Sequence, residues 1–209
     1  MSDQNEVVEE EEEEIKAILL GEISTGKTSL INTAIGLKFE EKVESTTTNS
    51  ITNKTMKINN KTYSINLWDT IGQEKYRSLT KIFIKGAKIV IFVYDITNYD
   101  SFKELNYWFE STKDVISHKA VKAIVGNKND LYLKEEVKEE EAKKLAKEKG
   151  MEFALTSAKD PRLFCEFLEK LIRKYLGEEV NDENEENKIK NKKEKLKLGE
   201  KQKGKKKCC

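Results

Sequence analysis

The sequence has few of the residues that would place it in several common classes of protein. One proline and ten glycines among 209 residues are too few for collagen-like or proline-rich material. A single histidine, His118, argues against a histidine-rich metal site, and three cysteines are too few for a disulfide framework. The longest uninterrupted apolar run, Ile89 to Tyr94, is far shorter than the ~18 residues of a bilayer-spanning helix. We therefore expect a protein of a reducing compartment with no membrane-spanning helix.

Charge is concentrated at the two ends of the chain, although the formal net charge is only +1. Residues 1–14 hold eight acidic residues and no basic one, which is unlike a secretory signal. Residues 188–207 hold eleven lysines against two glutamates. Charge blocks of this kind are typical of solvated, disordered segments. We therefore predict an acidic N-terminus over 1–14, one folded domain over 15–176, and a charged tail over 177–209.

Apolar periodicity and glycine positions divide the middle of the chain into alternating strands and helices. The pair Asn59-Asn60 is typical of a two-residue hairpin turn, and Asp100 is the expected N-cap of a helix. Alternation of this kind predicts an α/β fold, a mostly parallel six-stranded sheet with one antiparallel strand and helices on both faces. The predicted strands are 15–20, 51–58, 62–68, 88–94, 121–125 and 152–155, and the predicted helices are 27–35, 100–117, 137–149 and 162–176.

A phosphate-binding loop follows the first predicted strand. The segment Gly21-Glu-Ile-Ser-Thr-Gly-Lys-Thr28 matches G-x-x-x-x-G-K-[ST]. Its glycines allow the backbone N–H groups to point at phosphate oxygens, and the helix that begins near Lys27 adds its positive end. Lys27 supplies a charge to the outer phosphates and the Thr28 hydroxyl can ligate Mg²⁺. The sequence therefore predicts a P-loop nucleotide-binding fold.

Three further segments favour a guanine nucleotide. Asp69 ends a predicted strand on the metal side of the loop, and it is followed by Gly72, which can donate an N–H to the γ-phosphate, and Gln73, which can orient a water. In Gly126-Asn-Lys-Asn-Asp130 a carboxylate can accept two N–H bonds from guanine, which adenine cannot donate. Thr156-Ser-Ala-Lys159 follows the last strand. A P-loop ATPase or small-molecule kinase is the disfavoured alternative, which nucleotide selectivity would test.

Together these motifs resemble those of the Ras-type small GTPases, most closely the Rab branch. The resemblance covers Ile15 to about Leu176 and is strongest in Trp68 to Leu79, in Tyr94-Asp-Ile-Thr97 and in the terminal Cys208-Cys209. It implies a switch that hydrolyses GTP to GDP and recruits effectors in vesicle and membrane trafficking, with Mg²⁺ as its metal. An exchange factor and a GTPase-activating protein are the implied regulators.

The resemblance also implies a role for individual residues. It assigns Mg²⁺ to Thr28, Thr46 and, through water, Asp69, the attacking water to Gln73, and an apolar effector patch to Ile51, Trp68 and Phe83. Three alternatives stay open: Phe39 as a core residue, Thr47 or Thr48 in place of Thr46, and the patch as ordinary packing. The residues implied to hold GTP or GDP are Gly21, Ile23, Ser24, Thr25, Gly26, Lys27, Thr28, Phe39, Thr46, Gly72, Asn127, Lys128, Asp130, Ser157, Ala158 and Lys159.

The sequence departs from the family pattern at three places. Ile23 stands in the loop where the family usually has glycine or serine, beside the γ-phosphate and the attacking water. Ile71 precedes Gly72 in place of alanine, and Thr47-Thr48 replaces Ile-Gly. We expect slow intrinsic hydrolysis and a poor response to an activating protein. The alternative function is a GTP-locked, membrane-bound effector-binding module with little GTPase activity.

The end of the chain suggests a lipid anchor. The resemblance implies geranylgeranylation of Cys208 and Cys209, and two buried chains beside several lysines would hold a membrane firmly. Prenylation machinery and a soluble carrier that shields the lipids are then implied partners. We expect a location on the cytoplasmic face of intracellular membranes with a cytosolic pool, no nucleic-acid partner, and no stable homo-oligomer.

Overall fold

A six-stranded sheet forms the centre of the structure. The structure is a computed structural model that describes residues 13–41, 46, 50–70 and 82–178. The strand order is β2-β3-β1-β4-β5-β6, and every neighbouring pair is parallel except the antiparallel β2–β3 pair. The predicted fold class is therefore confirmed. The strands are β1 (Glu13–Leu20), β2 (Ser50–Ile58), β3 (Lys61–Asp69), β4 (Ile89–Asp95), β5 (Val121–Asn127) and β6 (Glu152–Leu155).

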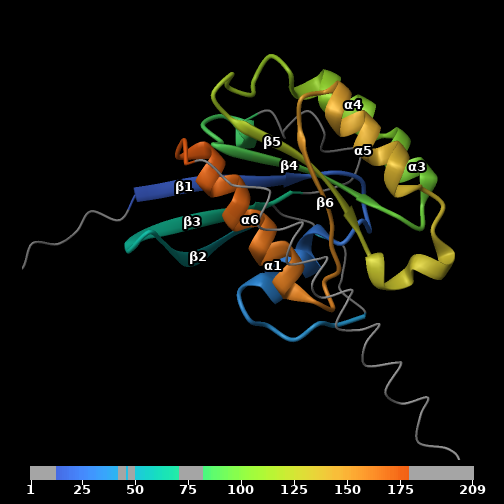
Figure 1. The fold of residues 1–209 in the computed structure, drawn as a ribbon, viewed down its shortest axis with the longest axis horizontal. Coiled ribbons are helices and arrows are strands. Elements are labelled where there is room, and N and C mark those ends of the chain that lie inside the picture. The colour runs from blue at the N-terminus through green and yellow to red at the C-terminus, as the bar shows by residue number, and fades with distance from the viewer. Residues whose placement is uncertain (1–12, 42–45, 47–49, 71–81, 179–209) are drawn as a thin grey trace, which may run out of the picture. The chain divides into compact units, whose positions relative to one another are not determined.

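Helices cover both faces of this sheet (Figure 1). On one face α1 and α6 pack over one buried apolar cluster, and on the other α3, α4 and α5 pack over a second. All of these elements belong to the unit formed by residues 1–176, and residues 177–209 form a separate unit. The helices are α1 (Lys27–Ala34), α3 (Tyr99–Lys103), α4 (Leu105–Thr112), α5 (Glu139–Glu148) and α6 (Pro161–Tyr175), with a 3-10 helix, η2 (Asn129–Lys134).

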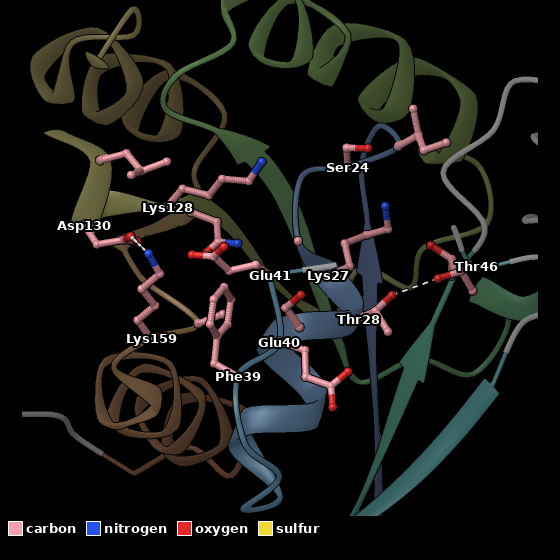
Figure 2. Close-up of a pocket in the computed structure, with 17 residues that line it drawn as sticks. Ser24, Lys27, Thr28, Phe39, Glu40, Glu41, Thr46, Lys128, Asp130 and Lys159 are labelled. Carbon is pink, nitrogen blue, oxygen red and sulfur yellow. Dashed lines mark hydrogen bonds and ion pairs between the residues drawn. The ribbon is translucent and has the colours of Figure 1, made fainter. Parts of the chain in front are cut away.

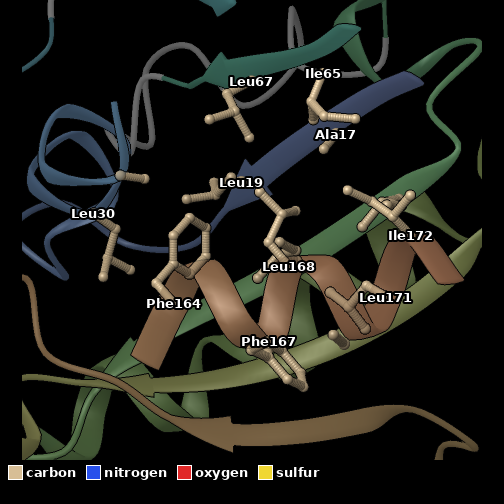
Figure 3. Close-up of a cluster of buried hydrophobic side chains, with 14 of the residues drawn as sticks. Ala17, Leu19, Leu30, Ile65, Leu67, Phe164, Phe167, Leu168, Leu171 and Ile172 are labelled. Carbon is tan, nitrogen blue, oxygen red and sulfur yellow. The ribbon is translucent and has the colours of Figure 1, made fainter. Parts of the chain in front are cut away.

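Strand β4 explains why the middle of the chain carries an uninterrupted apolar run. Ile89, Ile91 and Val93 point into the cluster under α1 and α6, whereas the residues between them point into the cluster under α3, α4 and α5. Both faces of a central parallel strand are buried, so both sets of side chains must be apolar. Figure 3 shows the first cluster, in which Leu168 of α6 lies over the sheet.

The predicted hairpin between β2 and β3 is confirmed. Asn59 and Asn60 have φ values of 49° and 65°, which is the left-handed pair that a two-residue hairpin turn requires. The register places Ile51 opposite Trp68 and Ser50 opposite Asp69. The hairpin therefore carries the end of β3 to the edge of the sheet where the other motifs lie.

The predicted helix over 100–117 is wrong in its start, its continuity and its end. The N-cap is Asn98, whose side chain accepts a hydrogen bond from the Ser101 N–H at 3.1 Å, so Asp100 lies inside the first turn. The chain forms two short helices that meet at Glu104, and the second ends at Thr112. The Thr112 hydroxyl donates to the Trp108 carbonyl and the next residues turn back toward β5. Asn and Asp cap equally well, so sequence alone cannot separate two caps two residues apart.

Candidate functional site

The predicted motifs meet at the edge of the sheet where the parallel strands end. The loops after β1, β3, β5 and β6 all leave from this edge, which is where α/β sheets bind ligands. They enclose a cleft of about 390 Å³, within the size range of small-molecule sites, which Figure 2 shows. The cleft is lined by Ile23, Ser24, Gly26, Lys27, Thr28, Ser29, Phe39, Glu40, Glu41, Thr46, Thr70, Asn127, Lys128, Asp130, Leu131, Ala158 and Lys159.

The loop between β1 and α1 has the backbone of an anion-binding loop. Ser24 and Gly26 adopt positive φ values of 63° and 89°, so the chain curls before the helix starts at Lys27. A Cβ on Gly26 would lie 2.4 Å from Nδ2 of Asn127, so this position admits only glycine. Successive N–H groups in such a curl form a concave site for phosphate oxygens.

Lys27 lies beneath this loop. Its Nζ donates to the carbonyl oxygens of Gly21 at 2.9 Å and Glu22 at 2.8 Å. Burial lowers the pKa of Lys27 to about 8, although the charges of Asp69 and Glu22 act in the opposite direction. The ammonium is therefore poorly solvated where it lies, and a phosphate would supply the counter-charge that it lacks.

Three oxygen-bearing side chains gather beside the loop. The Thr28 hydroxyl donates to Asp69 Oδ2 at 2.6 Å and lies 2.8 Å from the Thr46 hydroxyl. Asp69 is buried, and its Oδ1 has no hydrogen-bond partner within the described structure. Burial raises the pKa of Asp69, while the Thr28 hydrogen bond and the Lys27 charge oppose the shift.

This set of oxygens fits the expected Mg²⁺ site. Mg²⁺ prefers oxygen ligands and is held by few protein groups together with phosphate and water. The orphaned Asp69 Oδ1 is the kind of buried acceptor that a metal-bound water would satisfy. The described residues contain no cluster of three or more His, Cys, Asp or Glu side chains that could hold a metal by itself. Of the three candidate threonines, Thr46 lies at the site, and Thr47 and Thr48 lie outside the described residues.

Asn127 ties the two ends of the cleft together. The side chain is buried, its Nδ2 donates to the Thr25 carbonyl at 2.9 Å, and its Oδ1 accepts from the Thr156 hydroxyl at 3.3 Å. Thr25 in turn donates to the Glu22 carbonyl. These contacts hold the phosphate-binding loop against the end of β5, so Asn127 is a positioning residue as well as a lining one.

Asp130 carries the charge at the far end of the cleft. Its Oδ1 accepts from the Ser157 hydroxyl at 2.6 Å, and its Oδ2 lies 3.1 Å from Nζ of Lys159. Burial alone would raise the pKa of Asp130, but the hydrogen bonds from Ser157 and Lys159 and the Lys159 charge together lower it. The carboxylate is therefore ionised near neutral pH and keeps lone pairs for further donors.

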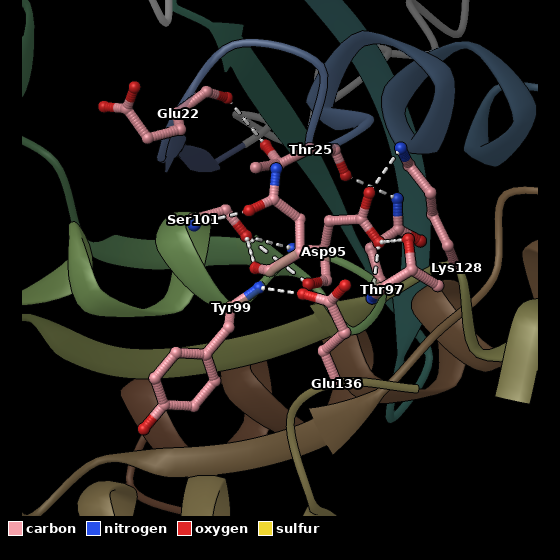
Figure 4. Close-up of polar contacts among 10 residues, drawn as sticks. Glu22, Thr25, Asp95, Thr97, Tyr99, Ser101, Lys128 and Glu136 are labelled. Atoms are coloured by element: carbon pink, nitrogen blue, oxygen red, sulfur yellow. Dashed lines mark hydrogen bonds and ion pairs between the residues drawn. The ribbon is translucent and has the colours of Figure 1, made fainter. Parts of the chain in front are cut away.

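Aromatic and aliphatic surface flanks this carboxylate. Phe39 lines the cleft with 36% of its surface exposed, so the alternative that it is a core residue is wrong. Nζ of Lys159 lies 5.4 Å from the centre of its ring. Lys128 crosses from the other side, and its Nζ pairs with Asp95 at 2.6 Å, which Figure 4 shows. A flat ring could therefore lie between Phe39 and the stem of Lys128.

Comparison with known proteins identifies the family. A Ras family model matches residues 16–177, close to the span of the resemblance. Similar proteins are Ras-related protein Rab5A of Oryza sativa subsp. japonica (39% identical over 144 residues, 69% of this chain and 71% of the relative), RHN1 of Nicotiana plumbaginifolia (40% over 144, 69% and 72%) and Rab-2B of Dictyostelium discoideum (34% over 161, 77% and 80%). The chain belongs to the Rab branch of the Ras family.

Membership confirms the resemblance at the level of the family. This Rab protein is a small GTPase whose nucleotides are GTP and GDP. It belongs to a family of molecular switches that act in membrane trafficking. In the part of the chain that the structure describes, no helix is both long enough and apolar enough to cross a bilayer.

The predicted effector patch of this Rab protein lies on one surface. Ile51 of β2 is 55% exposed and faces Trp68 across the β2–β3 pair, and the rings of Trp68 and Phe83 are 5.9 Å apart. Nζ of Lys16 lies 3.7 Å from the centre of the Trp68 ring. Trp68 and Phe83 also pack against the buried cluster under α4, so packing and surface display are combined in the same residues.

Several predicted site residues support the cleft of the Rab protein without lining it. Gly21 does not reach the cleft; a Cβ there would lie 2.1 Å from the Val93 carbonyl oxygen, so its role is close packing of the loop on β4. Thr25, Asp69 and Ser157 act through Asn127, Thr28 and Asp130. Gly72, Gln73, Cys208 and Cys209 lie outside the described residues, so their roles stay predictions.

Sequence reasoning missed other residues of this Rab protein. Ser29, Glu40, Glu41, Thr70 and Leu131 line the cleft as direct neighbours of motif residues, and only that adjacency could have indicated them.

It also missed Asp95, which holds Lys128 and accepts from the Thr97 N–H and hydroxyl. The segment Tyr94-Asp-Ile-Thr97 indicated the family in the sequence, but it did not predict the ion pair between Asp95 and Lys128.

Proposed function

We propose that the cleft binds GTP and GDP with the phosphates in the 21–28 loop and the guanine against Asp130. The observation that supports this most directly is the charge arrangement, a buried cation at one end of a single cleft and an ionised carboxylate at the other. Lys27 matches the phosphates and Asp130 matches the two N–H donors of guanine. Phe39 and the Lys128 stem supply the faces between which the base lies.

The phosphate end works by fixed electrostatics. Lys27 exchanges its bonds to the loop carbonyls for phosphate oxygens, and the N–H groups of residues 23–28 complete the cradle. Thr28 and Thr46 would hold Mg²⁺ directly and Asp69 through water, and the ion would neutralise charge on the phosphate oxygens. Gly72 donates its N–H to the γ-phosphate and Gln73 orients the attacking water.

The base end selects guanine over adenine. The Asp130 carboxylate accepts from two guanine nitrogens, and Ser157, Ala158 and Lys159 form the loop that fixes it. Adenine presents an acceptor where guanine presents a donor, so it would face the partly buried Asp130 carboxylate without the hydrogen bonds that guanine makes. A site built on such hydrogen bonds can reject the wrong ligand by ~10⁴-fold or more.

Hydrolysis is proposed to be slow because of Ile23. This side chain lines the cleft and remains 42% exposed, so it occupies space beside the phosphates instead of packing into the domain. An arginine finger and a well-placed glutamine supply ~10³–10⁵ in rate, and both need that space. The same observation favours the second candidate function, a GTP-locked effector-binding module with little GTPase activity.

The GTP-bound protein acts by recruiting effectors to a membrane. GTP orders the segments around Thr46 and Gly72, and the patch of Ile51, Trp68 and Phe83 binds effectors in that state. An exchange factor and a GTPase-activating protein set the cycle.

Geranylgeranyl groups on Cys208 and Cys209 anchor the chain to the cytoplasmic face of intracellular membranes. The prenylation machinery adds these groups, and a lipid-shielding carrier maintains a cytosolic pool.

Nucleotide selectivity tests the proposed function. In titration calorimetry the protein should bind GDP or GTP with Mg²⁺ far more tightly than ATP. Asp130→Ala should weaken guanine nucleotide binding by ~100-fold or more, because the base loses its two acceptors. Asp114→Ala, an equal change of an exposed aspartate away from the cleft, should leave binding unchanged. Equal affinity for ATP and GTP would refute the assignment.

A further inference from the structure

A second cavity lies at the end of the sheet where the parallel strands begin, opposite to the nucleotide cleft. It has a volume of about 200 Å³ and is bounded by the end of α4, the start of β5 and the residues just before β6. Phe92, Phe109 and Met151 give it an apolar floor. No residue of this cavity lines the nucleotide cleft.

The rim of this basic pocket is positively charged. Lys113, Lys122 and Lys149 border it against one acidic residue, Glu110, so lysine exceeds acid by two. Glu110 pairs with Lys113 at 2.7 Å, and Nζ of Lys149 lies 5.5 Å from the centre of the Phe109 ring. Among the described carboxylates none forms an ion pair with Lys122. The pocket therefore suits an occupant that brings several negative charges and a small apolar group.

The acidic N-terminal segment has this chemistry. Residues 9–12 are four consecutive glutamates, and Val7 and Val8 precede them directly. Each exposed Glu–Lys pair at the rim contributes little free energy by itself. Several glutamates of one segment would pair at the same time, so their contributions to docking add. Val7 or Val8 could cover the exposed part of the apolar floor.

The N-terminal segment also starts at the correct end of the sheet. β1 and β5 are the two neighbours of β4, so they lie about 10 Å apart. Glu13 lies four residues before the level of Ile89 and Val121, which is ~13 Å along the strand. Residues 7–12 lie within six residues of Glu13, and six residues of extended chain span up to ~20 Å, more than the ~16 Å to which the two offsets combine. Residues 7–12 can therefore reach the pocket without any change in the sheet.

We propose that residues 7–12 dock in the basic pocket of the same molecule, with glutamates of the 9–12 run against Lys122 and Lys149. The docked segment occupies this surface and excludes other acidic ligands from it. Because the contacts are exposed ion pairs, docking weakens as ionic strength rises.

Zero-length cross-linking with a carbodiimide tests the contact in the full chain. The reagent joins a carboxylate to an amine only when the two are in contact. The Lys61–Glu13 pair, at 3.1 Å, provides an internal standard that must react. We expect links from Glu9–Glu12 to Lys122 or Lys149 at low salt and their loss at high salt. If the standard reacts and these links are absent, the proposal is wrong.

Two further measurements separate docking from other origins of a link. In an equal mixture of ¹⁵N-labelled and unlabelled chains, intramolecular links contain one isotope only, and mixed links would overturn the proposal in favour of a second copy. His118, the only histidine, borders the pocket and gives a single imidazole signal in NMR. Neutralising Glu9, Glu10, Glu11 and Glu12 to Gln should shift that signal, and an unchanged signal would also overturn the proposal.

Matched charge reversals locate the occupied surface. Lys122→Glu with Lys149→Glu leaves no amine there to be linked, so its readout is the His118 signal. In that variant the Gln substitutions at residues 9–12 should no longer shift the signal, and the Lys61–Glu13 link should be kept. Lys134→Glu with Lys144→Glu makes the same change of charge on exposed lysines that do not border the pocket. This control should keep the His118 shift and both kinds of link. Loss of the His118 shift in both double variants would show that general charge attraction, and not the pocket, holds the segment.

Discussion

Ile23 is the residue at which the phosphate-binding loop departs most clearly from the family pattern. It is half-exposed within the cleft, beside the proposed position of the γ-phosphate. We predict that Ile23→Ser raises the single-turnover rate of GTP hydrolysis by about ten-fold, which corresponds to about 1.4 kcal/mol of regained transition-state stabilisation. Rapid-quench measurement of released phosphate gives this rate.

A matched substitution controls for loss of an exposed isoleucine. Ile35 is 37% exposed at the end of α1 and does not line the cleft, so Ile35→Ser should leave the rate unchanged. If Ile23→Ser hydrolyses GTP no faster than the parent chain, the proposal that Ile23 slows hydrolysis is wrong.

We predict that Lys27 makes nucleotide binding sensitive to alkaline pH. Burial lowers its pKa to about 8, so the free protein loses the ammonium as the pH rises through that value. Phosphates bind the charged form of Lys27. Binding at pH 9 therefore requires Lys27 to take up a proton, which it already carries at pH 7. Affinity should then fall by up to about ten-fold per pH unit above 8.

Calorimetry in buffers of different ionisation enthalpy measures this proton directly. Uptake should be larger at pH 9 than at pH 7.5, approaching one proton per nucleotide. Lys27→Arg stays charged over this range, so any binding that it retains should show no such increase. An uptake that is equal at both pH values in the parent chain would contradict the assignment.

At the scale of one helix, Asn98 determines where α3 starts. Its side chain accepts from the Ser101 N–H, which would otherwise be an unpaired donor of the first turn. We predict that Asn98→Ala lowers the free energy of unfolding by about 1 kcal/mol, because that hydrogen bond is lost. Asn98→Ser should recover most of the loss. Urea unfolding measures both, and an Ala variant as stable as the parent would show that the cap contributes little.

The cap also illustrates how far sequence patterns determine the elements. The strands are predicted to within one or two residues, because a buried parallel strand such as β4 must be apolar at every position. The turn at Asn59-Asn60 is predicted for a similarly local reason. The helix over 100–117 is not predicted correctly. Its cap, its division at Glu104 and its end at Thr112 depend on which of several competing contacts is more stable, and the sequence does not show this.

The site shows the same limit. Lys27, Thr28 and Asp130 are predictable because a fixed motif places each side chain on a loop of known backbone. The packing role of Gly21 against Val93 and the hold of Asp95 on Lys128 are not, because both join segments far apart in the sequence. Motifs therefore predict which residues line the cleft, while the folded chain is needed to find the residues that position them.

For the whole molecule, the cleft joins the ends of four strands, so nucleotide binding should stabilise the entire domain. Ligand at about 1,000 times its Kd adds ~4 kcal/mol to the stability of the bound protein. In a domain of this size that corresponds to a rise in Tm of about 8–16 °C, and we predict such a rise with GDP and Mg²⁺ in differential scanning calorimetry. ADP should produce almost none, because adenine cannot donate the two hydrogen bonds that Asp130 is proposed to accept from guanine.

Metal removal separates the contribution of Mg²⁺ to this rise in Tm from that of the nucleotide. Chelation with EDTA should reduce the GDP-dependent rise in Tm, because the phosphates then repel Asp69 without a cation between them. Thr28→Val removes a hydroxyl that contacts both Asp69 and Thr46 and keeps the shape of the side chain. In that variant the rise should be smaller and insensitive to EDTA. A rise in the parent chain that EDTA leaves unchanged would show that Thr28, Thr46 and Asp69 hold no metal beside the nucleotide.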